Sequence, residues 1–195
     1  MLNRLAVSLL LLVLLVPVGD AQASDVELAP FFGLQYGGSM VTVSGQAFAI
    51  DPGIQYGATL DIPFSSEWSF EALYARQDTD LASVPRIGFA VERYLVGARQ
   101  EFDAGRSRFL GVALVGLTRM VPDSGSSEER FTIAVGLGLR RPLGKHIGVR
   151  GDVRGYYAIL SSAGGTACVN ANCLFTFGTN GVWQGDVTGA LSWTF

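Results

Sequence analysis

The sequence has no long apolar run beyond residue 23, no cluster of lysine and arginine, and only one histidine. No later stretch reaches the roughly 18 consecutive apolar residues that indicate a membrane-spanning helix. The formal net charge is −3 at pH 7, so we expect no nucleic-acid partner. The sequence also lacks G-x-S-x-G, H-E-x-x-H and a phosphate-binding loop. These absences argue against a helical membrane protein and against several hydrolase and nucleotide-binding classes.

Residues 1–23 have the pattern of a cleaved secretory signal peptide. Arg4 precedes an apolar core at Leu9–Val16, which is followed by Pro17 and by Ala21 and Ala23 in a cleavage signature. The core is shorter than the about 20 residues of a membrane helix, so an uncleaved anchor is the less favoured alternative. No cysteine lies directly after the core, so a lipoprotein signal is not indicated. We expect one mature domain over residues 24–195.

The remaining chain divides into eight segments in which apolar and polar residues alternate. Dispersed among them are most of the 25 glycines and 12 phenylalanines, a pattern typical of an all-β chain with many turns. Each segment is near or above the roughly 9–11 residues that a tilted strand needs to cross a bilayer. The segments are 26–38, 53–64, 68–77, 87–102, 108–120, 130–143, 147–159 and 182–195.

The connections between the segments alternate in length. Short linkers follow the second, fourth and sixth segments, whereas long polar linkers follow the first, third, fifth and seventh. This alternation is typical of an outer-membrane barrel whose amino terminus faces the periplasm, and such bacterial barrels have an even number of strands. The sequence therefore predicts a closed eight-stranded antiparallel transmembrane β-barrel, an up-and-down meander.

The size of the side chains indicates which face of each segment points inward. In the sixth and eighth segments the polar face is rich in glycine, alanine and serine, which suits a narrow interior, and the apolar face is bulky. Aromatic residues gather near the segment ends, as expected for rings at both membrane interfaces. On the predicted periplasmic side they are Phe64, Trp68, Phe102, Trp193 and Phe195, and on the outer side Tyr36, Tyr56, Tyr74, Phe131, Tyr157 and Trp183.

Two segments are harder to orient. The fifth is apolar on both faces; we expect Leu110, Val112 and Leu114 to face lipid, with Phe109, Val115 and Leu117 as the alternative set. In the fourth, an outward face with Tyr94, Val96 and Phe102 also places Glu92 outward, above the bilayer.

The third segment contains "SFEALYARQ", and the chain ends with "GALSWTF". In these motifs and in the eight-segment plan, the chain resembles the outer-membrane β-barrel domain of OmpA-, OmpX- and OmpW-type proteins. The resemblance implies an outer-membrane location, contact with outer-membrane lipids and lipopolysaccharide, and a barrel-only member, since no peptidoglycan-binding domain follows Phe195. It also implies that Trp193 and Phe195 form a terminal aromatic signal for the barrel-assembly machinery.

Charged residues concentrate on the predicted inward face. They form either an ion-pair gate or solute path, or a structural plug of mutually neutralising charges, and we favour the plug because side chains fill an eight-stranded interior. The predicted lumen cluster consists of Glu71, Arg93, Arg99, Arg140, Arg150, Asp152, Arg154 and Asp186.

The remaining polar residues indicate no catalytic, metal or cofactor site. His146 falls in a predicted periplasmic turn, whereas a lipid-modifying barrel enzyme needs a histidine base beside a serine near the outer leaflet. Cys168 and Cys173 lie in the longest outer loop, where we expect a disulfide rather than metal binding.

We therefore expect a non-enzymatic outer-membrane protein that contributes to envelope integrity or contacts surface partners through its extracellular loops. The alternative is a narrow, OmpW-like channel for small or apolar solutes. A lipid-modifying barrel enzyme is the least favoured hypothesis, because of the position of His146.

Overall fold

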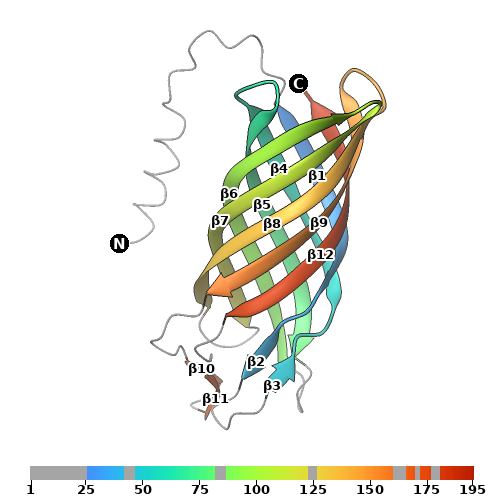
Figure 1. Cartoon of the computed structure of the whole chain (residues 1–195). Helices are drawn as coiled ribbons and strands as arrows, with labels where there is room; N and C mark the ends of the chain where they lie inside the picture. The colour runs from blue at the N-terminus through green and yellow to red at the C-terminus, as the bar shows by residue number, and fades with distance from the viewer. Residues whose placement is uncertain are drawn as a thin grey trace.

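Eight long strands close into a barrel in the computed structural model of the chain, which describes residues 26–41, 47–81, 87–122, 127–159, 166–169, 172–176 and 181–195. The strands hydrogen-bond in the order β1-β12-β9-β8-β7-β6-β5-β4, and every neighbouring pair is antiparallel (Figure 1). The predicted eight-stranded antiparallel barrel is confirmed. The strands are β1 (Glu27–Tyr36), β4 (Gly53–Pro63), β5 (Trp68–Leu81), β6 (Ile87–Ala104), β7 (Ser107–Pro122), β8 (Glu128–Pro142), β9 (Ile147–Ile159) and β12 (Val182–Thr194).

The two ends of the barrel differ in their connections. Brief turns at residues 64–67, 105–106 and 143–146 join strands at one end, called here the short-turn end, and the carboxyl terminus lies there too (Figure 1). The opposite, long-loop end carries two small hairpins, β2 (Ser39–Val41) with β3 (Ala47–Ala49) and β10 (Thr166–Val169) with β11 (Asn172–Thr176). The sequence predicted only polar loops at these places, because pairings of three to five residues are too short to produce a visible alternation. The predicted signal peptide lies outside the described residues.

The outer wall of the barrel is apolar and its inner wall is largely polar. In β8 the outward Leu137 is 72% exposed, whereas the inward Thr132 is completely buried. Aromatic rings lie on the outer wall near both ends: Tyr157 stacks on Trp183 with ring centroids 4.7 Å apart, and Phe64 on Phe70 at 4.5 Å. The predicted orientation of the apolar faces is thus confirmed for β8, β9 and β12. Among the described residues, no helix is long and apolar enough to cross a membrane.

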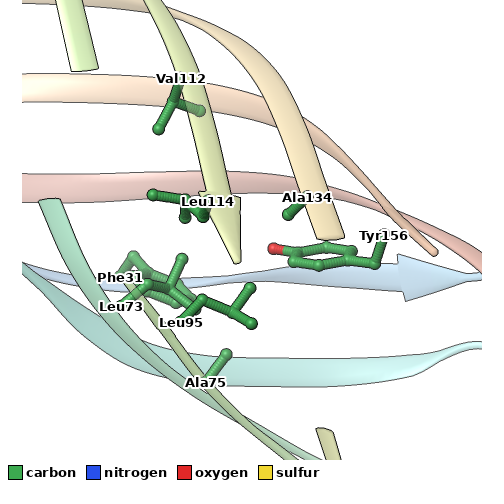
Figure 2. Packing of buried hydrophobic residues seen from close by; sticks show 8 residues of the cluster. All are labelled: Phe31, Leu73, Ala75, Leu95, Val112, Leu114, Ala134 and Tyr156. Atoms are coloured by element: carbon green, nitrogen blue, oxygen red, sulfur yellow. The ribbon is translucent and has the colours of Figure 1, made fainter. Parts of the chain in front are cut away.

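The favoured orientation of the fifth predicted segment, now β7, is wrong. Phe109, Val115 and Leu117 are the outward set, and the residues expected to face lipid point inward instead. The reason is an apolar cluster inside the barrel, against which the inward side of β7 packs. Figure 2 shows side chains of this interior apolar cluster gathered inside the barrel: Phe31, Leu73, Ala75, Leu95, Val112, Leu114, Ala134 and Tyr156; Leu110 is also buried.

Glu92 lies on the outward side of β6, as expected, but it is only 8% exposed. Neighbouring outward side chains cover its carboxylate: Arg76 contacts it at 2.9 Å, the Tyr94 hydroxyl donates to it at 3.3 Å, and Arg119 lies 3.9 Å away. Cross-strand neighbours therefore compensate this charge on the outer wall.

Candidate functional site

The interior charges form a network centred on Arg150 of β9. Its side chain is completely buried and its guanidinium contacts three carboxylates: Asp61 of β4 at 3.0 Å, Glu71 of β5 at 2.8 Å and Asp152 of β9 at 2.9 Å. The contacts join opposite walls of the barrel, because β9 and the β4–β5 pair are not neighbours in the sheet. The ion pairs of Arg150 thus span the lumen at this level.

Arg99 of β6 and Arg140 of β8 extend the network toward the short-turn end. Arg99 contacts Asp61 and Glu101, each at 2.7 Å, and its distance to Glu27 is 3.6 Å. Arg140 contacts the other carboxylate oxygen of Glu27 at 2.5 Å. The carboxylates of Asp61 and Glu27 are therefore each shared between two arginines.

On the other side of Arg150, Arg154 lies between Glu71 at 3.2 Å and Asp152 at 3.6 Å. Its guanidinium also lies over the ring of Phe31, 5.9 Å from the ring centroid. The ionic network and the interior apolar cluster therefore meet at Arg154.

A second polar group lies nearer the long-loop end. Arg93 donates to Gln35 at 2.8 Å and to Gln184 at 2.5 Å, and its guanidinium lies 4.4 Å from the centroid of the Tyr156 ring. The Tyr156 hydroxyl donates to Asp186 at 2.6 Å, and Gln55 also donates to that carboxylate. Tyr156 thereby links this group to the interior apolar cluster, of which it is a member.

All eight residues of the predicted lumen cluster point into the barrel. Seven are buried, and Arg140, near the short-turn end, retains 15% of its side-chain exposure. Sequence reasoning missed Glu27 and Asp61, which complete the network. The alternation of faces along each strand could have identified both residues. Each lies between outward apolar residues, as Asp61 does between Leu60 and Ile62, and so must point inward.

Across this network and the second polar group, five arginines face five carboxylates, and Glu101, which Arg99 also contacts, is paired with Arg108 of the rim at 2.8 Å. The arginines are Arg93, Arg99, Arg140, Arg150 and Arg154, and the carboxylates are Glu27, Asp61, Glu71, Asp152 and Asp186. Buried charges are tolerated when they are paired and hydrogen-bonded, whereas an unpaired one is costly. The arrangement can fill and neutralise the lumen, and among the described residues no group of three or more His, Cys, Asp or Glu side chains is placed to hold a metal ion.

Two glycines of β8 make room for this network. Gly136 is paired with Arg154 and Gly138 with Asp152 across the β8–β9 ladder. A Cβ atom at Gly136 would lie 2.7 Å from Cγ of Arg154, and one at Gly138 would overlap Oδ1 of Asp152. The small residues that indicated a narrow interior are thus the partners of long charged side chains on the next strand.

The other predicted site residues lie at the two ends of the molecule. Trp193 and Phe195 are exposed on the outer wall at the short-turn end. His146 is exposed in the β8–β9 turn, with Nδ1 3.0 Å from the backbone oxygen of Thr194. Cys168 and Cys173 face each other in the β10–β11 register, but their side chains are outside the described part of the chain, so the disulfide stays a prediction.

A closed eight-stranded barrel with an apolar outer wall, aromatic rings at both ends and long loops at one end is the architecture of a bacterial outer-membrane barrel. The model of the outer membrane protein beta-barrel domain family matches residues 8–195. The chain belongs to this family, and the protein is located in the outer membrane. Its short-turn end is therefore the periplasmic end, and its long-loop end is extracellular.

Solved structures with the same fold show how widely it is used. Neisserial surface protein A is 15% identical, with a TM-score of 0.62 over 88% of this chain and 97% of that chain. OprG of Pseudomonas aeruginosa is 14% identical, with a TM-score of 0.59 over 89% and 96%. The outer membrane protease OmpT of Escherichia coli is 8% identical, with a TM-score of 0.52 over 92% and 99%. At these identities the likeness concerns the fold alone, and a comparison with curated protein sequences gives no match.

Proposed function

We propose that the protein is a non-enzymatic outer-membrane barrel with a closed lumen, which contributes to envelope integrity or surface interaction through its extracellular loops. The observation that carries this proposal is the position of Arg150, whose contacts with Asp61 and Glu71 cross the lumen. A solute would have to separate a buried ion pair to pass, at a cost of several kcal/mol. The interior apolar cluster fills the neighbouring cross-section.

Ion conductance tests the closed lumen. The purified protein is reconstituted in planar lipid bilayers, alongside Arg150→Ala and a matched Arg108→Ala control whose side chain is 46% exposed at the periplasmic rim. We expect no steady conductance from the wild type or the control. Stable channels in the wild-type protein, with a conductance changed by Arg150→Ala, would show that the charges form a gate and would favour the channel alternative.

The non-enzymatic part of the proposal is supported by the position of the sole histidine. His146 lies at the periplasmic end and contacts a backbone oxygen, far from the extracellular loops that meet the outer leaflet. We expect cells expressing the wild type and His146→Ala to have identical lipid A and phospholipid profiles by mass spectrometry. A lipid species that appears with the wild type and disappears with His146→Ala would identify an enzyme.

A loop replacement tests the surface role. Residues 164–180, which include β10 and β11, are replaced by a short Gly-Ser turn, and outer-membrane levels are matched before any comparison. We expect the variant to lose adherence to surfaces or resistance to serum, while the barrel still shifts on unheated gels. A correctly inserted variant with unchanged adherence, serum resistance and detergent sensitivity would contradict the proposal.

A further inference from the structure

The periplasmic mouth of the barrel contains a pocket of about 340 Å³, called here the periplasmic vestibule. Its walls come from several strands and from the β4–β5 and β8–β9 turns, so it opens along the barrel axis to the periplasm. Glu27, Arg99 and Arg140 form its inner end. A volume near 300 Å³ is at the lower limit of small-molecule sites, which restricts the vestibule to compact ligands.

Among the described residues, two charged side chains of the vestibule have no ionic partner. Lys145, in the β8–β9 turn, has no carboxylate within 4.0 Å among the described residues. Glu67, in the β4–β5 turn, likewise has no cationic group within that distance in the described part of the chain. Both line the vestibule, whose other charged groups are mostly engaged with each other. The vestibule thus offers one cation and one carboxylate that are available for a ligand.

The two turns hold their backbones in fixed positions. In the β4–β5 turn the Ser65 hydroxyl accepts from the Trp68 amide at 3.0 Å, and the backbone oxygen of Glu67 accepts from the Glu101 amide at 2.7 Å. In the β8–β9 turn the backbone oxygen of Ile147 accepts from the Leu143 amide at 2.9 Å. This order reduces the entropy that a ligand must overcome when it binds between them.

The inner end of the vestibule also has unused hydrogen-bonding capacity. Nε of Arg140 is buried and has no hydrogen-bond partner among the described residues, whereas the Glu27 carboxylate is held by Arg140 at 2.5 Å and by Arg99 at 3.6 Å. Buried polar atoms in folded proteins are normally satisfied by protein, water or ligand. A buried donor is therefore present behind Lys145 and Glu67.

From these observations we propose that the periplasmic vestibule binds a compact zwitterion that carries a free ammonium and a free carboxylate, such as an amino acid or dipeptide. The ligand carboxylate pairs with Lys145, and its ammonium pairs with Glu67. The Arg150 contacts close the lumen beyond the inner end, so the vestibule is a dead-end binding site and not the entrance of a channel.

The first test is an NMR titration of the isotope-labelled protein refolded in detergent micelles, with alanyl-alanine as the probe. We expect saturable shifts of the amides of residues 65–69 and 144–147, with none in β2 or β3. N-acetyl-alanyl-alanine, which lacks the ammonium, and alanyl-alaninamide, which lacks the carboxylate, are each expected to bind about three- to fivefold more weakly. Absence of saturable shifts at the two turns would overturn the proposal.

Charge-neutral variants then assign each contact. Lys145→Gln should weaken alanyl-alanine binding about three- to fivefold and leave alanyl-alaninamide binding unchanged. Glu67→Gln should weaken alanyl-alanine binding to a similar extent and leave binding of the N-acetyl derivative unchanged, because that derivative lacks the ammonium. The two ligands should then bind this variant equally. The matched control is Arg106→Gln, which removes an exposed cation of the β6–β7 turn outside the vestibule. Equal weakening by the control, or no effect of Lys145→Gln, would exclude the assigned contacts.

Discussion

Replacing Arg150 with methionine is expected to destabilise the barrel by about 3–5 kcal/mol, the usual cost of removing one partner from a buried ionic group. The side chain is completely buried and contacts three carboxylates. Asp61 would retain Arg99 at 2.7 Å, and Glu71 would retain Arg154 at 3.2 Å, so neither loses every partner. The network would nevertheless keep one uncompensated negative charge in a low-dielectric interior, which is the source of the cost.

Urea unfolding in phospholipid vesicles measures this free energy. Trp68, Trp183 and Trp193 all lie on the outer wall, so tryptophan fluorescence reports when the barrel leaves the lipid. The double variant Arg150→Met/Glu71→Gln restores neutrality and should recover about 1–3 kcal/mol relative to the sum of the single variants.

A matched control is Arg108→Met, whose side chain is 46% exposed and pairs with Glu101 at 2.8 Å. We expect this variant to lose less than about 1 kcal/mol, because its ion pair lies at the solvent-accessible rim. An Arg150→Met cost as small as that of Arg108→Met, or strict additivity in the double variant, would refute the reasoning that the interior charges depend on one another.

Three further predictions concern other parts of the molecule. Gly138→Ala should lower the unfolding free energy by about 1–3 kcal/mol, because its methyl group overlaps Asp152; an unchanged urea midpoint would contradict this. Leu137→Arg, on the lipid-facing wall, should cost about 2–4 kcal/mol in vesicles, and a cost below 1 kcal/mol would place the residue outside the bilayer core. Cys168 and Cys173 should react with a maleimide only after reduction, which mass spectrometry detects; labelling without reduction would exclude the disulfide.

The barrel could be predicted from the sequence because most of its strands differ clearly between their two faces. In β9, for example, Arg150 and Asp152 alternate with Val149 and Val153, and this pattern determines both the strand and its orientation. The alternation of linker lengths then gave the order of the strands and the two ends of the barrel, both of which the structure has.

The orientation of β7 could not be predicted from β7 alone, because its inner face packs against apolar side chains from other strands. The information needed to orient β7 is in those other strands. Leu73 lies two residues from Glu71, and Leu95 two residues from Arg93, so each leucine is on the same inward face as the charged residue. These two inward leucines predict an apolar patch inside the barrel, and Leu114 is the β7 residue that joins this patch. The contacts of Arg150 across the lumen depend on how far the strands are staggered along the barrel axis. The alternation of apolar and polar residues gives the face of each residue but not this stagger.

The direct pairing of β1 with β12 has a consequence for how the protein is made. In this ladder Tyr36 lies opposite Gly185. Near it, the hydrogen bonds from Gln184 to the backbone oxygen of Gly37 and from Gln55 of β4 to Asp186 of β12 join residues 147 and 131 positions apart. Contacts of such long range are slow to form and give no stabilisation to a partly synthesised chain. Until β12 arrives, the arginines and carboxylates of the inner wall lack the enclosure that isolates them from lipid. Insertion should therefore be nearly all-or-none, with the last strand to be exported completing the wall that makes the rest of the chain compatible with a membrane.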